Sequence, residues 1–69
     1  MPVVQVNIKA GRTLEQKREV VARMTDALVD VCGAIRQNVH VIINEIDESN
    51  WGREGQLLSD IAGKSKTEE

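Results

Sequence analysis

The chain has 69 residues, a net charge of −2 and one aromatic residue. At this length the hydrophobic gain on folding barely exceeds the conformational entropy lost, so a chain without disulfides or metal usually needs a partner. The charge balance argues against a nucleic-acid binder, and no apolar run approaches the roughly 20 residues of a membrane helix. We therefore predict one domain over residues 1–63 and a polar tail over residues 64–69, with neither nucleic acid nor membrane as a partner.

The cysteine and histidine content limits the kinds of site that this chain can carry. Cys32 is the only cysteine, so no internal disulfide can form, and the N-terminus lacks the charged and long apolar regions of a secretory signal. These features predict a reducing compartment, the cytoplasm. Cys32 and the single histidine do not have the spacing of a zinc site, so we predict no metal site.

The first stretch of the chain has the pattern of a half-buried strand. Val4, Val6 and Ile8 fall on one face, because side chains alternate with a period of two along a strand. Pro2 suits the first position of a strand, where its missing N–H costs nothing. It also has a chemical interpretation: if Met1 is removed, Pro2 carries a secondary amine that titrates near neutrality and can act as a general base.

An amphipathic helix is predicted next. Thr13 and Gln16 fit a capping box, in which each side chain bonds the backbone N–H of the other residue. Apolar residues then recur at spacings of three, four and seven as far as Val31. Gly33 is the predicted end of the helix, since glycine accepts the left-handed conformation just past a helix terminus.

A second alternating run, from Asn38 to Ile46, predicts a second strand. Two strands joined through a helix of this length form a β-α-β unit, in which the strands are parallel. The helix can cover only one face of this sheet, and a lone two-stranded sheet is marginal in water. The predicted fold class is therefore α/β, a single β-α-β unit completed by oligomerisation.

The remainder of the chain is shorter and richer in turn residues. Residues 47–56 predict a loop or small hairpin, and the apolar residues between Leu57 and Ile61 predict a short closing helix or turn. Trp51 lies among the turn residues. Its large ring with a polar edge suits two uses, either capping the chain's own core or a subunit boundary, or lining a pocket.

Several of these features together resemble the small-subunit 4-oxalocrotonate tautomerase family. They are Pro2 before a short alternating strand, the run Gly11-Arg12-Thr13 with Glu15-Gln16-Lys17, a second strand carrying Val41-Ile42-Ile43 and Glu45, and the pair Trp51-Gly52. The resemblance extends over roughly residues 2 to 60 without an obvious gap. Its most specific parts are Pro2 and the Gly-Arg-Thr and Glu-Gln-Lys runs.

The resemblance implies a cofactor-independent isomerase of β-α-β fold. Members assemble into homo-oligomers, as dimers or as hexamers built from three dimers. In such enzymes the N-terminal proline moves a proton within a 2-hydroxydienoate or enol to give the conjugated ketone, so the implied substrate is a small enolisable 2-oxo acid. Some relatives dehalogenate or decarboxylate unsaturated acids.

Residue roles follow from the matched positions. Pro2 matches the catalytic proline, provided that Met1 is removed, because an acylated proline nitrogen has no basicity. Arg12 matches the arginine that holds a substrate carboxylate, and a planar guanidinium suits a bidentate contact with that group. Trp51 matches the aromatic residue, commonly phenylalanine, that forms the apolar wall beside the proline.

The chain departs from the family at His40, where the best-known tautomerases have a second arginine for the substrate's other carboxylate. A histidine reaches less far and is mostly neutral at pH 7, so His40 is a candidate polarising group while a diacid substrate is less expected. Arg36 and Arg53 are further cations that a subunit boundary can bring to the pocket.

Two alternative functions remain open from the sequence. One is a dehalogenase or hydratase acting on an unsaturated acid, in which a protonated Pro2 donates to carbon and Glu45 or His40 activates water. The other is a catalytically weak assembly subunit of a hetero-oligomer, in which a related chain supplies the second arginine.

Overall fold

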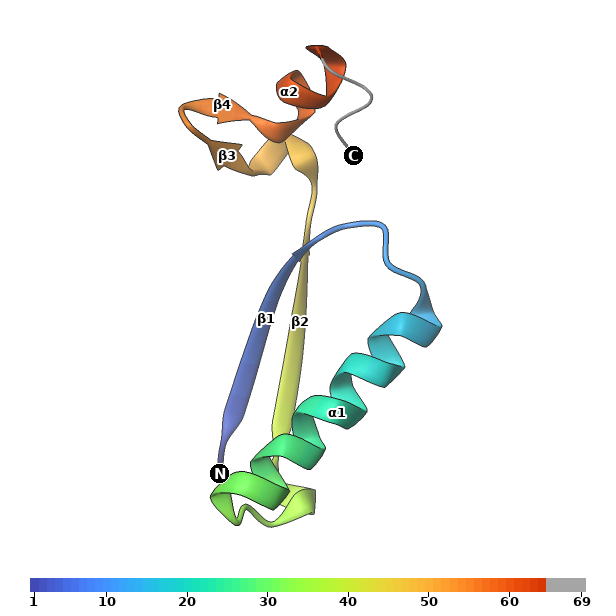
Figure 1. The fold of residues 1–69 in the computed structure, drawn as a ribbon, viewed down its shortest axis with the longest axis vertical. Helices are drawn as coiled ribbons and strands as arrows, with labels where there is room; N and C mark the ends of the chain where they lie inside the picture. Colours follow the sequence, from blue (N-terminus) through green and yellow to red (C-terminus); the bar gives the residue numbers. More distant parts are fainter. Residues whose placement is uncertain (65–69) are drawn as a thin grey trace.

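The structure, a computed structural model, describes residues 1–64, with side chains described as far as Ile61. Two parallel strands, β1 (Val3–Lys9) and β2 (His40–Ile46), are connected by the long helix α1 (Leu14–Cys32) and a short 3-10 turn, η1 (Arg36–Asn38). A second 3-10 turn, η2 (Glu48–Asn50), leads to the two-residue strands β3 (Gly52–Arg53) and β4 (Gln56–Leu57) and to helix α2 (Leu58–Lys64). Figure 1 shows the hairpin and α2 beyond one end of the parallel strands.

The parallel pairing of β1 with β2 confirms the predicted β-α-β unit. All seven residues of β1 have partners, from Val3 opposite His40 to Lys9 opposite Ile46. The predicted start of the second strand at Asn38 is wrong, because Arg36–Asn38 forms a 3-10 turn and Asn38 donates its backbone N–H to the Ile35 carbonyl at 2.8 Å. An amide used in this turn is not available to the β ladder.

Both predicted ends of α1 are confirmed. The Thr13 hydroxyl accepts a hydrogen bond from the Gln16 backbone N–H at 3.1 Å, and the Gln16 side chain accepts one from the Thr13 N–H at 2.9 Å. Gly33 closes the helix in the left-handed conformation, with φ of 70°, and its N–H donates to the Val29 carbonyl at 3.1 Å. These caps satisfy backbone groups that the helix itself leaves unpaired.

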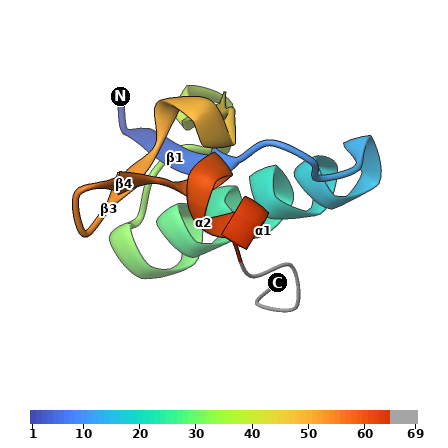
Figure 2. The same cartoon turned by 90° about the horizontal axis from the view of Figure 1, so that it is seen from above.

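The two faces of the parallel sheet differ in what covers them. Helix α1 lies against one face (Figures 1 and 2), and an ion pair of 2.7 Å between Lys17 of α1 and Glu45 of β2 spans the interface. The opposite face, which we call the open face, is uncovered in the single chain. Its exposed residues are Val3, Gln5, Asn7, His40, Ile42 and Asn44, and the half-buried Lys9 and Ile46 follow at the far end of the strands.

The segment after β2 confirms the predicted small hairpin and closing helix. Strands β3 and β4 pair in antiparallel fashion, with Gly52 opposite Leu57, and the Leu58 N–H donates to the Trp51 carbonyl at 2.8 Å. Of the predicted polar tail over residues 64–69, only Lys64 falls among the described residues, as the last residue of α2; the rest lies outside them.

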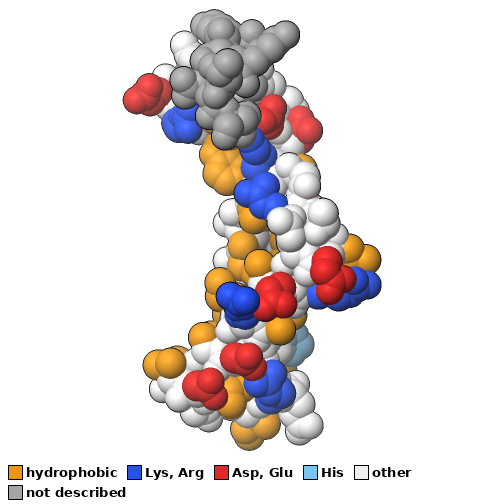
Figure 3. Space-filling model, turned by 45° about the vertical axis from the view of Figure 1, so that its right-hand side comes forward, with side chains coloured by type: hydrophobic (Ala, Val, Ile, Leu, Met, Phe, Trp, Pro, Cys, Tyr) orange, Lys and Arg blue, Asp and Glu red, His pale blue; other side chains and the backbone are white. Residues whose placement is uncertain are grey.

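The single chain is more extended than a compact domain of its length. Its radius of gyration is 15.6 Å, compared with about 11 Å for a compact domain of this length. Among residues 1–61 no side chain is fully buried, and Val31, Ile35 and Val3 are 83, 62 and 54% exposed. Hydrophobic side chains reach the surface along the length of the face in Figure 3. We therefore expect the chain to fold as part of an oligomer.

If folding requires association, thermal stability will depend on protein concentration. We expect the Tm to rise steadily when the concentration of chains increases from about 1 to 100 μM, because mass action favours the assembled folded state. Differential scanning calorimetry with light scattering measures both the Tm and the mass. A constant Tm together with a monomeric mass would contradict this expectation.

Candidate active site

Pro2 and His40 lie side by side where the parallel sheet begins. The His40 backbone N–H donates to the Pro2 carbonyl at 3.0 Å, and Val3 stands opposite His40 in the ladder. The His40 side chain is exposed on the open face. Sheet pairing therefore places the only histidine of the chain next to the residue that matches the catalytic proline.

The amino terminus at this end is accessible to processing. Met1 is 83% exposed, while Pro2 is half-buried at the start of β1. With Met1 attached, the Pro2 nitrogen is an amide; with Met1 removed, it becomes a secondary amine fixed at the end of a strand.

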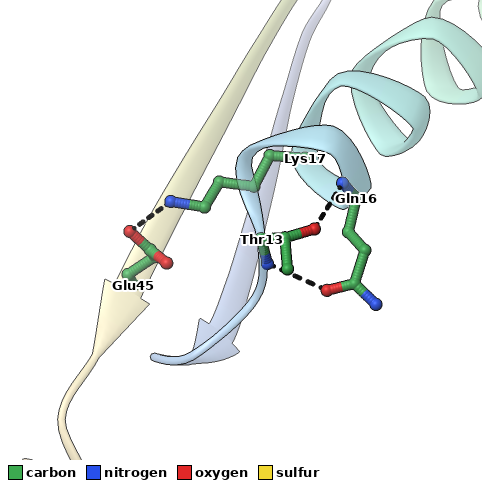
Figure 4. A network of polar contacts seen from close by, with 4 residues as sticks. All are labelled: Thr13, Gln16, Lys17 and Glu45. Carbon is green, nitrogen blue, oxygen red and sulfur yellow. Dashed lines mark hydrogen bonds and ion pairs between the residues drawn. The ribbon is translucent and has the colours of Figure 1, made fainter.

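Arg12 lies at the opposite end of β1, in the connection to α1. Its side chain is exposed and lines an open depression of about 380 Å³ on the surface of α1, together with Gln16, Lys17, Glu19, Val20, Arg23 and Met24. The capping box of Thr13 and Gln16 fixes the backbone immediately after Arg12 (Figure 4). The cap therefore fixes the backbone beside Arg12, whereas the end of the Arg12 side chain is held by no described ion pair.

Arg12 differs from most cations of the chain because it has no carboxylate partner. Among the arginines and lysines whose side chains the structure describes, only Arg12 and Arg53 lack an ion pair. The pairs that occupy the others are Lys9–Glu48, Lys17–Glu45, Arg18–Glu15, Arg23–Glu19 and Arg36–Asp26. An unpaired guanidinium is available to bind a carboxylate from outside the chain.

Trp51 lies beyond the end of β2, at the junction between η2 and the hairpin. It is half-buried, and its backbone N–H donates to the Glu48 carbonyl at 3.4 Å. Asp47 caps this turn by accepting a hydrogen bond from the Ser49 backbone N–H at 3.0 Å. Sequence analysis missed this role of Asp47, although an aspartate two residues before a serine in a turn-rich stretch is a signal for such a cap.

The four predicted site residues fall into two groups within one chain. Pro2 and His40 lie at the start of the parallel sheet, whereas Arg12 lies in the connection that follows β1 and Trp51 in the segment that follows β2, both after the other end of the strands. The seven residues of β1 span about 20 Å, since a strand rises by about 3.3 Å per residue. A small substrate cannot contact both groups of one chain at once, so a site that uses all four residues needs at least two chains.

Two other candidate residues are engaged elsewhere. The Glu45 carboxylate is paired with Lys17 across the helix-covered face (Figure 4), and Glu45 stands opposite Ile8, near the end of β1 that is remote from Pro2. The Arg36 guanidinium bonds Asp26 of α1, on the covered side of the sheet. Within one chain, therefore, His40 and not Glu45 lies at the Pro2 end of the sheet.

The open face also carries a polar contact that the sequence pattern did not reveal. The Asn44 side-chain amide donates to the Asn7 side-chain oxygen at 3.0 Å, and these residues stand opposite one another in the ladder. Only the register of the two strands, which a sequence does not specify by itself, shows that they meet.

Within residues 1–64, no group of three or more His, Cys, Asp or Glu side chains is arranged to hold a metal ion. No helix in this part of the chain is long and apolar enough to cross a membrane.

Comparison with known proteins decides the family. The tautomerase enzyme family is matched over residues 2–61, with Pro2 as the first matched residue. The chain belongs to the tautomerase family. Within it, a probable tautomerase of Ralstonia nicotianae is 42% identical over 55 residues, which cover 80% of this chain and 79% of the relative. A probable tautomerase of Streptococcus pneumoniae is 40% identical over 57 residues, covering 83% of this chain and 95% of the relative.

Solved structures place this tautomerase-family chain among the 4-oxalocrotonate tautomerases. A 4-oxalocrotonate tautomerase isozyme from Methylibium petroleiphilum superposes with a TM-score of 0.89 at 33% identity, covering 93% of this chain and all of that chain. A heterohexameric 4-oxalocrotonate tautomerase from Chloroflexus aurantiacus, at 23% identity, shares the fold with a TM-score of 0.82 over 88% of this chain and 98% of that one. The predicted family and fold are confirmed.

The cap at Asp47 gives a testable pH dependence. Hydrogen bonds from the Ser49 hydroxyl and backbone N–H hold the pKa of the Asp47 carboxyl below its usual range. A lowered folded-state pKa means that the carboxylate stabilises the fold above the unfolded pKa, and that this contribution disappears as the pH falls through the folded pKa.

We therefore expect the difference in unfolding midpoint between wild type and Asp47→Asn to be constant above about pH 5 and to shrink below about pH 4. Urea unfolding followed by the fluorescence of Trp51, the only tryptophan, measures this difference. A difference that is the same at pH 7 and pH 3 would show that the Asp47 charge contributes nothing to the turn.

Proposed function

We propose that this chain is a cofactor-independent tautomerase that moves a proton within a small enolisable 2-oxo acid, using the Pro2 amine as general base. The observation that carries the proposal is that the family match begins at Pro2, which heads β1 beside His40 behind an exposed Met1. The names of the relatives support a tautomerase as the reaction class.

The chemistry requires a base that is uncharged near pH 7. A chain-terminal amine titrates at about 7.7–8.0 in model compounds, so about a tenth to a sixth of it is free base at pH 7. This amine accepts a proton from the enol or dienol of the substrate, and the resulting ammonium returns a proton to carbon to give the ketone. The proton count balances within one cycle, and no oxidant, reductant or second substrate is needed.

Arg12 of a neighbouring copy is the proposed anchor for the substrate carboxylate. Its guanidinium is exposed and has no partner among the described carboxylates. Because β1 separates Arg12 from the Pro2 of its own chain by about 20 Å, the Arg12 that serves a given Pro2 comes from a second chain. Trp51 lies at the same end as Arg12 and supplies an apolar wall to the same pocket.

The proposed assembly is a homo-oligomer, either a dimer or a hexamer of three dimers. It rests on the lack of a buried core among residues 1–61 and on the division of the site between the two ends of β1. The heterohexameric relative from Chloroflexus aurantiacus makes mixed subunits a second possibility for assembly. The mass of the native oligomer distinguishes one type of subunit from two.

Removal of the proposed base will abolish most of the activity. We expect Pro2→Ala to lower kcat by about 10²- to 10⁴-fold, the usual contribution of a general base. The assay is ketonisation of phenylenolpyruvate and of 2-hydroxymuconate, and intact mass of each protein establishes that Met1 has been removed. If the processed wild type turns over neither substrate faster than Pro2→Ala, the proposed function is wrong.

Arg12 and Arg53 provide a matched pair for testing the anchor, since both are exposed arginines without an ion pair. We expect Arg12→Ala to lower kcat/KM by about 10- to 100-fold, mainly through KM, because a charge-assisted hydrogen bond to the substrate is lost. Arg53→Ala is expected to change kcat/KM by less than twofold. Equal effects of the two substitutions would show that Arg12 acts only through the overall charge of the protein.

A further inference from the structure

His40 is the described ionisable side chain that sheet pairing brings beside the proposed base. Its backbone N–H is bonded to the Pro2 carbonyl at 3.0 Å, so the positions of the two residues are fixed relative to one another. Its imidazole is exposed on the open face and makes no hydrogen bond or ion pair with any other described residue. The imidazole is thus exposed at the same end of the sheet as the Pro2 amine, where it is available to a substrate bound at that end.

The charges around His40 are few. On the open face the ionisable residues are His40 and Lys9, and Lys9 lies at the opposite end of β1, where it pairs with Glu48 at 3.2 Å. The residues between them are uncharged. Turn η1 contributes Arg36, whose guanidinium is held by Asp26 of α1 on the covered side of the sheet. The remaining charge nearby is the terminal amine itself once Met1 is removed. The charge at this end of the site thus depends on the imidazole and the amine.

We infer that protonation of His40 decides whether the site accepts a second carboxylate on its substrate. The inference rests on the proposed function, in which Arg12 supplies a permanent positive charge for the first carboxylate. With His40 neutral, the substrate class is a monocarboxylate enol, because the described residues of the same chain offer a second carboxylate no other unpaired cation at this end of the sheet. With His40 protonated, a dicarboxylate enol is accepted as well.

The chemistry of the imidazole gives the sign and size of this effect. A neutral imidazole offers one N–H donor and no charge, whereas an imidazolium offers two donors and a positive charge. Histidine is the side chain whose charge ordinarily changes between pH 5 and 8. A charge-assisted hydrogen bond is about twice as strong as a neutral one, so the gain for a second carboxylate is about tenfold.

The test is the ratio of kcat/KM for 2-hydroxymuconate, a dicarboxylate, to that for phenylenolpyruvate, a monocarboxylate, measured from pH 5.5 to 8. Titration of the free Pro2 amine affects both substrates alike and cancels in this ratio. Both carboxylates of the diacid stay largely ionised over this range. In the wild type we expect the ratio to rise by about tenfold as the pH falls from 8 to 5.5.

Two substitutions at position 40 separate the charge of the side chain from its structural role. His40→Gln keeps a neutral donor and should hold the ratio low at every pH. His40→Arg introduces a permanent positive charge and should hold the ratio high at every pH. A wild-type ratio that changes by less than about twofold, or a His40→Gln profile that follows the wild type, overturns the inference.

Failure of the proposed function has a different signature. If Pro2→Ala leaves the turnover of both substrates unchanged, Pro2 is not the base and the inference falls together with the proposed function. If turnover depends on Pro2 but the ratio is flat with pH, the tautomerase proposal stands and only the role of His40 is wrong.

Discussion

Parallel pairing of β1 with β2 determines the layout of this protein. Because parallel strands need a long crossover between them, the chain must leave one end of the sheet, return along α1 and start β2 beside its own amino terminus. His40 therefore pairs next to Pro2, while the connection carrying Arg12 and the segment carrying Trp51 both lie at the far end. The same pairing that brings the proposed base and the histidine together separates them from the proposed anchor.

Association of several chains accounts both for the exposed apolar surface of the single chain and for the distance between its candidate site residues. A two-stranded sheet covered by a single helix leaves its open face and several apolar side chains in water, including Val31 and Ile35. Association buries such surface and, if the copies are suitably oriented, brings Arg12 of one chain to Pro2 of another. In this account stability and activity depend on the same subunit contacts, so a substitution at a subunit boundary can affect both.

Much of the fold was predictable because its signals are local. Thr13 and Gln16 lie within one turn of each other, and Gly33 marks the helix end through its own backbone preference. The start of β2 at His40 and the contact between Asn7 and Asn44 were not predictable, because they depend on strand register. The pairing of Arg36 with Asp26 joins residues ten positions apart, and nothing in the local pattern indicates it. The resemblance indicated the candidate site residues, and the length of β1 implies that a site using all of them takes residues from at least two chains.

The most direct test of this account is subunit mixing. Pro2→Ala and Arg12→Ala chains are unfolded together, refolded at equal concentrations and assayed for ketonisation, beside each variant refolded alone. If Pro2 and Arg12 of one site come from different chains, about one quarter of the sites in the mixture regain both residues, and activity exceeds the mean of the two parents by a wide margin. If the mixture shows only that mean, each site takes both residues from one chain and the account of a divided site is wrong.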